Sequence, residues 1–135
     1  MLTTETVRTN RYLDEDQAAR VVELWNAAYP GMREILDTVI RAKREAHQPS
    51  TDIERLEQVR RELGQMDRGT YRDCKRGPAV FRPSASWGHL LRVLKATPIG
   101  SPHAGSIHRL AAELADLTAA DTERRRTAQA ATGIR

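Results

Sequence analysis

The stretch MREILDTVIRAKREAHQPSTDIERLEQVRRELGQMD, residues 32–67, decides the fold. Its first half predicts an amphipathic helix, because apolar side chains recur every three or four residues while Arg33, Lys43 and Arg44 fall outside that stripe. The apolar positions are Ile35, Leu36, Val39, Ile40 and Ala46. Gln48-Pro49-Ser50 should end this helix, since proline cannot continue one.

The second half of the stretch predicts another helix, which begins at a capping box. In this motif the Thr51 hydroxyl accepts from the Glu54 amide and the Glu54 carboxylate accepts from the Thr51 amide. The apolar stripe has the 3-4-3 spacing of a coiled-coil seam and consists of Leu56, Val59, Leu63 and Met66. Because the link between the two helices is short, we expect them to form an antiparallel hairpin.

Helical patterns flank the hairpin on both sides. Residues 14–28 have helical periodicity, with acidic side chains in the first turn, and Tyr29-Pro30-Gly31 should end that helix. After the hairpin, Ser84 or Ser86 can cap a helix that stops before Pro98, and Ser106 can cap one that runs to Leu117. We read Phe81 and Trp87 as core rings.

These elements together predict an all-α fold, a single-domain helical bundle of four to five helices with a central antiparallel helical hairpin. A chain of 135 residues is near the common size of one domain. The expected parts are an N-terminal arm at 1–13, a bundle domain at 14–117 and an Arg/Ala-rich C-terminal tail at 118–135. The tail can be helical but has no core face, and Arg124-Arg125-Arg126 within it either contact phosphate or are solvated.

Several classes of protein are excluded by simple counts. The chain has one cysteine, Cys74, so it forms no internal disulfide, and we expect a reducing, cytoplasmic compartment. His103 and His108 have no neighbouring carboxylate or thiol in the sequence, so we expect no metal site. We expect no cofactor either, because no glycine-rich phosphate loop or nucleophile signature is present. The first residues do not form a secretion signal, and no run of 18 apolar residues indicates a membrane protein.

The charges are distributed unevenly along the chain. Residues 1–67 carry 10 basic and 13 acidic side chains, whereas residues 68–135 carry 12 and 5, so the two parts have net charges of −3 and +7. The segment 68–95 alone holds seven basic residues and one acid, Asp73. This asymmetry indicates either a polyanionic partner or head-to-tail contact between copies of the chain.

The basic loop at 68–85 is the main candidate site. It combines arginines, which pair with phosphates, with aromatic rings, on which bases stack. The residues assigned to nucleic-acid binding are Arg68, Tyr71, Arg72, Lys75, Arg76 and Arg82. In the alternative interpretation these side chains have no binding role: the arginines are solvated or pair with acidic helices, and the aromatic rings pack in the core.

An enzymatic reading depends on one short motif. Arg41 and His47 are separated by five residues, and this spacing resembles the R-x(4–6)-H motif of HEPN-type ribonucleases. The resemblance implies an all-helical dimer in which the two residues cleave RNA through the 2′-hydroxyl. The match covers seven residues on the first helix of the hairpin, where His47 can instead serve as a helix-end cation.

We therefore expect a non-enzymatic accessory or regulatory protein that binds the phosphate backbone of DNA or RNA through the basic loop. The alternative is a helical adaptor or structural subunit of a bacterial or phage homo-oligomeric assembly, in which a protein partner takes the place of nucleic acid. In either case we expect a homo-oligomer and no membrane. A HEPN-like ribonuclease is the third possibility.

Overall fold

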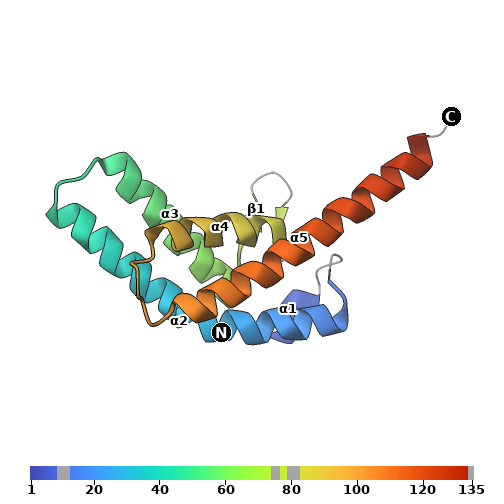
Figure 1. Ribbon diagram of the computed structural model, residues 1–135, viewed down its shortest axis with the longest axis horizontal. Helices are drawn as coiled ribbons and strands as arrows, with labels where there is room; N and C mark the ends of the chain where they lie inside the picture. Colours follow the sequence, from blue (N-terminus) through green and yellow to red (C-terminus); the bar gives the residue numbers. More distant parts are fainter. Residues whose placement is uncertain (9–12, 74–76, 79–82, 134–135) are drawn as a thin grey trace.

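The computed structural model describes residues 1–8, 13–73, 77–78 and 83–133, and it confirms the all-α prediction. Five helices lie within these residues: α1 (Thr4–Arg8), α2 (Glu15–Glu45), α3 (Ser50–Arg68), α4 (Pro83–Ala96) and α5 (Ala104–Gly133). Two short strands, β1 (Arg72–Asp73) and β2 (Gly77–Pro78), pair antiparallel between α3 and α4. Figure 1 shows α5 crossing the body and then extending beyond the other elements.

Helix α2 is continuous, so the predicted break at Tyr29-Pro30-Gly31 is wrong. Pro30 lies inside this 31-residue helix, although it cannot donate an intrahelical hydrogen bond. The apolar stripe of α2 runs past it without interruption, with Ala28, Gly31 and Met32 buried on either side. Tertiary packing of this stripe therefore outweighs the cost of the proline, as it often outweighs local propensity. The expected separate N-terminal helix is thus the first half of α2.

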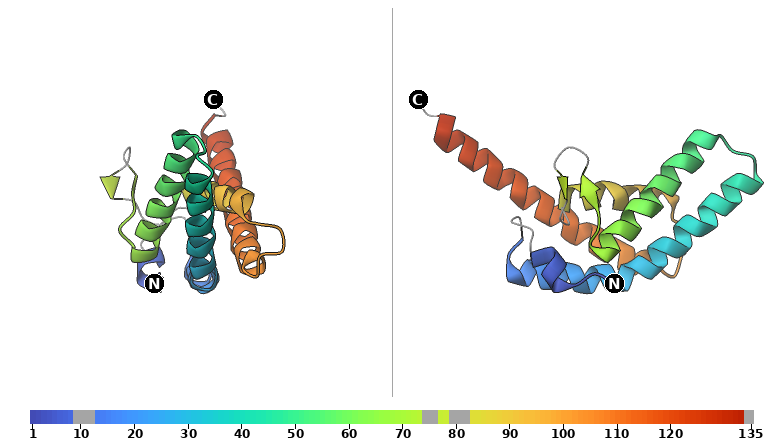
Figure 2. Two further views of the ribbon diagram at one scale, coloured as in Figure 1. Left: turned by 90° about the vertical axis from the view of Figure 1, so that its left-hand side faces the viewer. Right: turned by 180° about the vertical axis from the view of Figure 1, so that it is seen from behind.

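The antiparallel hairpin is formed by the second half of α2 and by α3, as predicted (Figure 2). Helix α3 begins at Ser50 behind Pro49 and has no side-chain cap, so the capping box predicted at Thr51 is wrong. Because α3 begins at Ser50, Thr51 lies inside its first turn, and the first residues of the helix are exposed, so water can satisfy their amides. A capping box does form at the start of α2, between Asp14 and Gln17.

The starts of α4 and α5 also differ from prediction. Helix α4 begins at Pro83, where proline suits a first turn, and Ser86 is completely buried inside the helix. Its hydroxyl lies 3.8 Å from the sulfur of Met66 on α3. Helix α5 begins at Ala104, so Ser106 lies in its first turn rather than at its cap.

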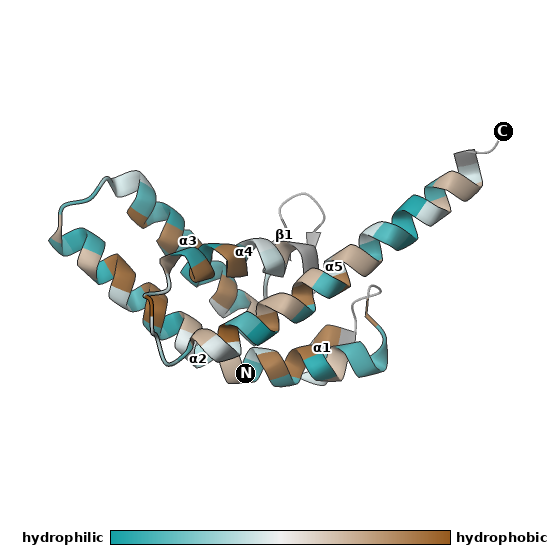
Figure 3. Cartoon of the chain, viewed as in Figure 1, coloured by the Kyte–Doolittle hydropathy of each residue, from teal (hydrophilic) through white to brown (hydrophobic). Residues whose placement is uncertain are grey.

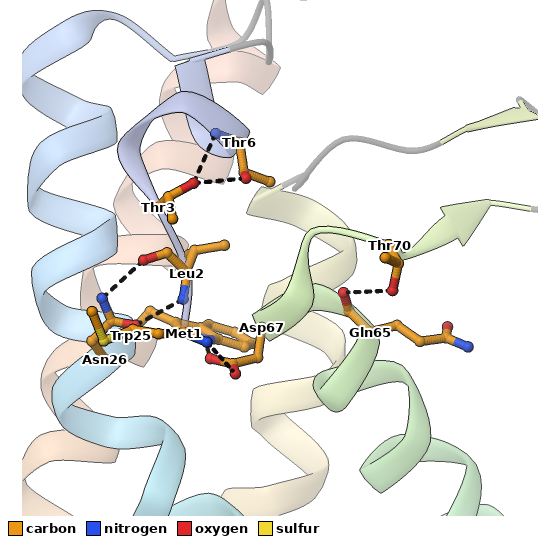
Figure 4. A network of polar contacts seen from close by, with 9 residues as sticks. All are labelled: Met1, Leu2, Thr3, Thr6, Trp25, Asn26, Gln65, Asp67 and Thr70. Atoms are coloured by element: carbon orange, nitrogen blue, oxygen red, sulfur yellow. Dashed lines mark hydrogen bonds and ion pairs between the residues drawn. The ribbon is translucent and has the colours of Figure 1, made fainter.

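The core is centred on α2 and includes the N-terminal arm. Trp25 is the largest fully buried side chain, and its indole donates to Asp67 Oδ1 over 2.9 Å. The Met1 amino group contacts the other oxygen of Asp67 at 3.0 Å, as Figure 4 shows. Leu2 and Val7 are buried as well, so residues 1–8 pack against the bundle. Trp87 is half-buried against the core, whereas Phe81 lies outside the described residues.

The loop between α4 and α5 packs closely against α2, where His103 lies against Gly31. A Cβ added at Gly31 would lie 2.5 Å from Cβ of His103, so only glycine permits this contact. The His103 ring also lies 2.6 Å from Glu34 Oε2, one turn further along α2. Position 31 therefore sets how closely the loop can pack on α2.

Helix α5 has two different halves. Ile107, Leu110, Leu114 and Leu117 are buried in the bundle, whereas residues 122–132 are all exposed. Figure 3 shows that the extending half is mostly polar or weakly apolar on its surface. The tail is thus helical to Gly133, yet it has no core face. None of the described helices is long and apolar enough to span a bilayer.

Candidate functional site

A groove rich in arginine lies between the two helices of the hairpin. We call it the arginine groove. Its volume is about 440 Å³, and it is lined by Tyr29, Arg33, Arg44, Glu57, Arg60, Arg61, Gly64 and Arg68. Five of these residues are cations and one is an anion, so the lining is strongly positive.

Helical periodicity explains why these side chains meet. Arg33 and Arg44 are 11 residues apart on α2, which corresponds to about three turns and a rise of about 16 Å. On α3, Glu57, Arg61, Gly64 and Arg68 are separated by four, three and four residues and so share one face. The hairpin places the two rows opposite each other.

The groove cations differ in how they are compensated. Arg44 pairs with Glu57, and Arg61 donates to the Gln58 side chain over 3.0 Å. Arg60 Nε lies 3.0 Å from Asp37 Oδ1 without the alignment of a hydrogen bond, so charge alone joins this pair. Among the described residues, Arg33 and Arg68 have no carboxylate partner. Two guanidinium groups in the groove therefore remain available to an anion.

Tyr29 connects the groove to the core. Its ring stacks on Trp25 with centroids 5.7 Å apart and an interplanar angle of 13°. Burial, helped by the negative charge of Asp67, raises the pKa of the Tyr29 hydroxyl despite the neighbouring arginines. A Cβ built at Gly64 would lie 3.5 Å from the Tyr29 hydroxyl and 3.3 Å from an Arg68 guanidinium nitrogen. A protonated hydroxyl and a guanidinium thus lie together where glycine leaves the helix surface bare.

The predicted basic strip is only partly described. Arg68 is exposed at the end of α3 and belongs to the arginine groove as well. Tyr71 is half-buried and meets the His89 ring edge-on, with centroids 6.1 Å apart, so its ring packs on α4. Arg72 lies in β1. Three of the predicted residues lie outside the described residues: Lys75, Arg76 and Arg82.

The residues of the ribonuclease-like motif do not line the arginine groove. Arg41 is exposed on α2, and His47 is exposed just beyond the end of that helix, with a left-handed φ of 52°. His47 therefore belongs to the turn of the hairpin. No cluster of three metal-ligating side chains occurs in the described part of the chain, and Cys74 falls outside it.

The arginine triplet of α5 is compensated within its own helix. Arg124 and Arg125 contact Asp121 at 3.5 and 3.1 Å, and Arg126 contacts Glu123 at 3.8 Å. These pairs have the i, i+3 and i, i+4 spacing that holds opposite charges together on a helix. The triplet therefore presents less net charge than its sequence suggests.

Sequence reasoning missed Arg33, Arg44, Arg60 and Arg61. The charges were counted over long segments, in which the acids of residues 1–67 concealed a positive face. The signal that could have found them is spacing: 11 residues on one helix and the four, three, four series on the other, given an antiparallel hairpin. No family model matches the chain, and no curated protein or solved structure does.

Proposed function

We propose that this protein binds the phosphate backbone of a nucleic acid through the arginine groove. The observation that supports the proposal is the convergence of five arginines from two helices on one groove, with Arg33 and Arg68 lacking a carboxylate partner among the described residues. Guanidinium groups pair with phosphate oxygens in a bidentate manner and remain charged at any physiological pH.

The binding is directed at phosphates rather than at bases. Apart from Tyr29, whose ring is stacked on Trp25, no aromatic side chain lines the groove among the described residues. The lining that the structure describes also holds no asparagine or glutamine, the side chains that recognise adenine. Phosphate contacts position a protein on nucleic acid without reading its sequence. The proposed role is therefore that of a sequence-independent accessory protein, with the basic loop at 68–85 continuing the contact from Arg68.

Fluorescence anisotropy of labelled duplex DNA and single-stranded RNA tests the proposal at two salt concentrations. Arg33→Ala/Arg68→Ala should weaken binding at least tenfold and lower the salt slope by about two, because each phosphate contact releases about one counterion. Arg124→Ala/Arg125→Ala is the matched control, since it removes two exposed arginines of α5. Its affinity should stay within about twofold of the original protein.

Two outcomes would overturn the proposal. One is an equal loss in both double variants, which would mean that only net charge matters. The other is no binding at low salt together with a discrete large oligomer in light scattering, which would favour the structural-subunit alternative. Arg72→Ala/Arg76→Ala/Arg82→Ala measures separately whether the basic loop contributes. An unchanged affinity and salt slope in that variant would remove the loop from the site.

A further inference from the structure

A second groove of different character lies where α2, α3 and α4 meet. We call it the amphipathic groove. It has a volume of about 560 Å³ and is lined by Val39, Lys43, Asp52, Arg55, Leu56, Arg92, Lys95 and Ala96. The two grooves share no residue.

The floor of the amphipathic groove is aliphatic. Val39, Leu56 and Ala96 come from three different helices, are half-buried and pack against the core. The arginine groove has no aliphatic side chain at all among its lining residues. An occupant of the amphipathic groove is therefore stabilised by burying its own apolar surface against this floor.

The rim of the amphipathic groove is basic and carries more cations than acids. Lys43, Arg55, Arg92 and Lys95 stand against one acid, Asp52. None of the four cations has an ion pair within the described part of the chain, although acidic residues share α2 with Lys43 and α3 with Arg55, and the charge of Arg92 acts on Glu62 from a longer distance. A ligand with a single negative charge would leave most of these cations without an anionic partner, so the rim fits an occupant with several anionic groups.

We propose that the amphipathic groove binds an acidic amphipathic helix of a partner protein. Such a helix combines the two features that the groove demands: aliphatic side chains at i, i+4 and i+7 for the floor, and carboxylates beside them for the rim. A nucleic acid fits less well, because the described lining of the groove offers no aromatic ring on which a base could stack. The proposal is independent of nucleic-acid binding at the arginine groove.

The test uses a fluorescein-labelled 15-residue peptide with leucines at i, i+4 and i+7 and glutamates at the other surface positions. Its control is a peptide of the same composition in which the leucines no longer share a face. The amphipathic peptide should bind with micromolar affinity, and the control at least tenfold more weakly. Equal binding of the two peptides would mean that the groove recognises charge alone and would overturn the proposal. The absence of binding at 0.1 mM peptide would overturn it as well.

Variants then locate the binding. Arg92→Glu/Lys95→Glu and, separately, Leu56→Ser should each weaken the peptide at least fivefold, with circular dichroism confirming the helical fold. Arg33→Ala/Arg68→Ala is the matched control in the other groove and should leave the peptide affinity within twofold. If the Arg92/Lys95 variant retained the peptide and instead lost nucleic acid, the groove would belong to a nucleic-acid surface and the proposal would be wrong.

Discussion

Two clusters of arginines in this protein differ in how far nearby carboxylates neutralise them. In the hairpin, residues distant in sequence are brought to one groove by the packing of α2 on α3, and two of them keep no carboxylate partner in the described structure. Three consecutive arginines lie in the exposed half of α5 and contact Asp121 or Glu123 on the same helix. The arginine triplet of α5, which is conspicuous in the sequence, is thus the better compensated cluster. The arginine groove, which retains arginines without a carboxylate partner, is formed only when α2 packs on α3.

The first prediction concerns the dependence of the groove on packing. Leu63, on α3, is 1% exposed, and Leu63→Ala should lower the free energy of unfolding by about 2–5 kcal/mol through lost burial and a cavity. Ala128→Gly in the exposed half of α5 should leave the global transition unchanged, because fraying there breaks no tertiary contact. Urea unfolding followed by circular dichroism measures both. Equal losses would mean that the end of α5 is packed in solution.

The second prediction concerns the position of α2, which supplies one side of the groove. Gly31→Ala should destabilise the protein by about 1–3 kcal/mol, because its Cβ would collide with Cβ of His103 and outweigh the better helix propensity of alanine. Gly88→Ala on α4 is the matched control. No atom of the described residues lies within 4 Å of its added Cβ, so this substitution should stabilise the protein by up to about 1 kcal/mol. Thermal unfolding distinguishes the two signs, and a stabilising Gly31→Ala would contradict the close contact.

The third prediction uses the contact between Glu62 on α3 and His89 on α4. Burial raises the pKa of the Glu62 carboxyl, but hydrogen bonds from His89 and Gln58 and the charges of His89 and Arg92 outweigh it, so the pKa lies below 4.5. Between the folded and unfolded values the unfolded chain binds more protons. This carboxylate therefore contributes stability above pH 4.5 that is lost as the pH falls through the folded pKa.

Urea titrations between pH 3 and 7 test this dependence. Glu62→Gln should flatten the loss of stability at acid pH. Asp121→Asn removes the half-buried acid that pairs with Arg124 and Arg125. It should leave the acid loss of stability almost as steep, because ion pairs within one helix contribute about 0.5 kcal/mol or less. If both variants had the same effect, the contact between α3 and α4 would be no stronger than a surface pair.

The smallest expected effect is on affinity. Glu57→Gln removes the carboxylate that pairs with Arg44 and should strengthen nucleic-acid binding about two- to fivefold, with a slightly steeper salt slope. Glu123→Gln releases Arg126 in the same way on α5 and should change the affinity less than twofold. Anisotropy titrations at one salt concentration compare the two, and a larger gain from Glu123→Gln would place the binding surface on α5.

Periodicity was enough to predict the class of the fold and the hairpin, because the apolar stripes from Ile35 to Ile40 and from Leu56 to Met66 match their buried faces. Local signals at helix ends were less informative. Pro30 lies inside α2 because the buried residues around it hold the helix together. Thr51 does not cap α3 because the helix begins one residue earlier, at Ser50.

The site was harder to predict than the fold, for a physical reason. Net charge over a segment sums all faces of its helices, whereas a ligand meets one face. Arg33 and Arg68 belong to helices that also carry many acids, so only the pairing of α2 with α3 reveals their shared groove. Arg68 alone was in the predicted strip.

The long end of α5 affects how the size of this protein can be measured. From Thr118 to Gly133 the helix extends about 24 Å at 1.5 Å per residue, away from the rest of the chain (Figure 2). A molecule with such an extension diffuses more slowly than a sphere of 15.2 kDa. A monomer should therefore elute early from a sizing column and imitate a dimer, while scattering or sedimentation equilibrium, which depend on mass alone, would still report a single chain.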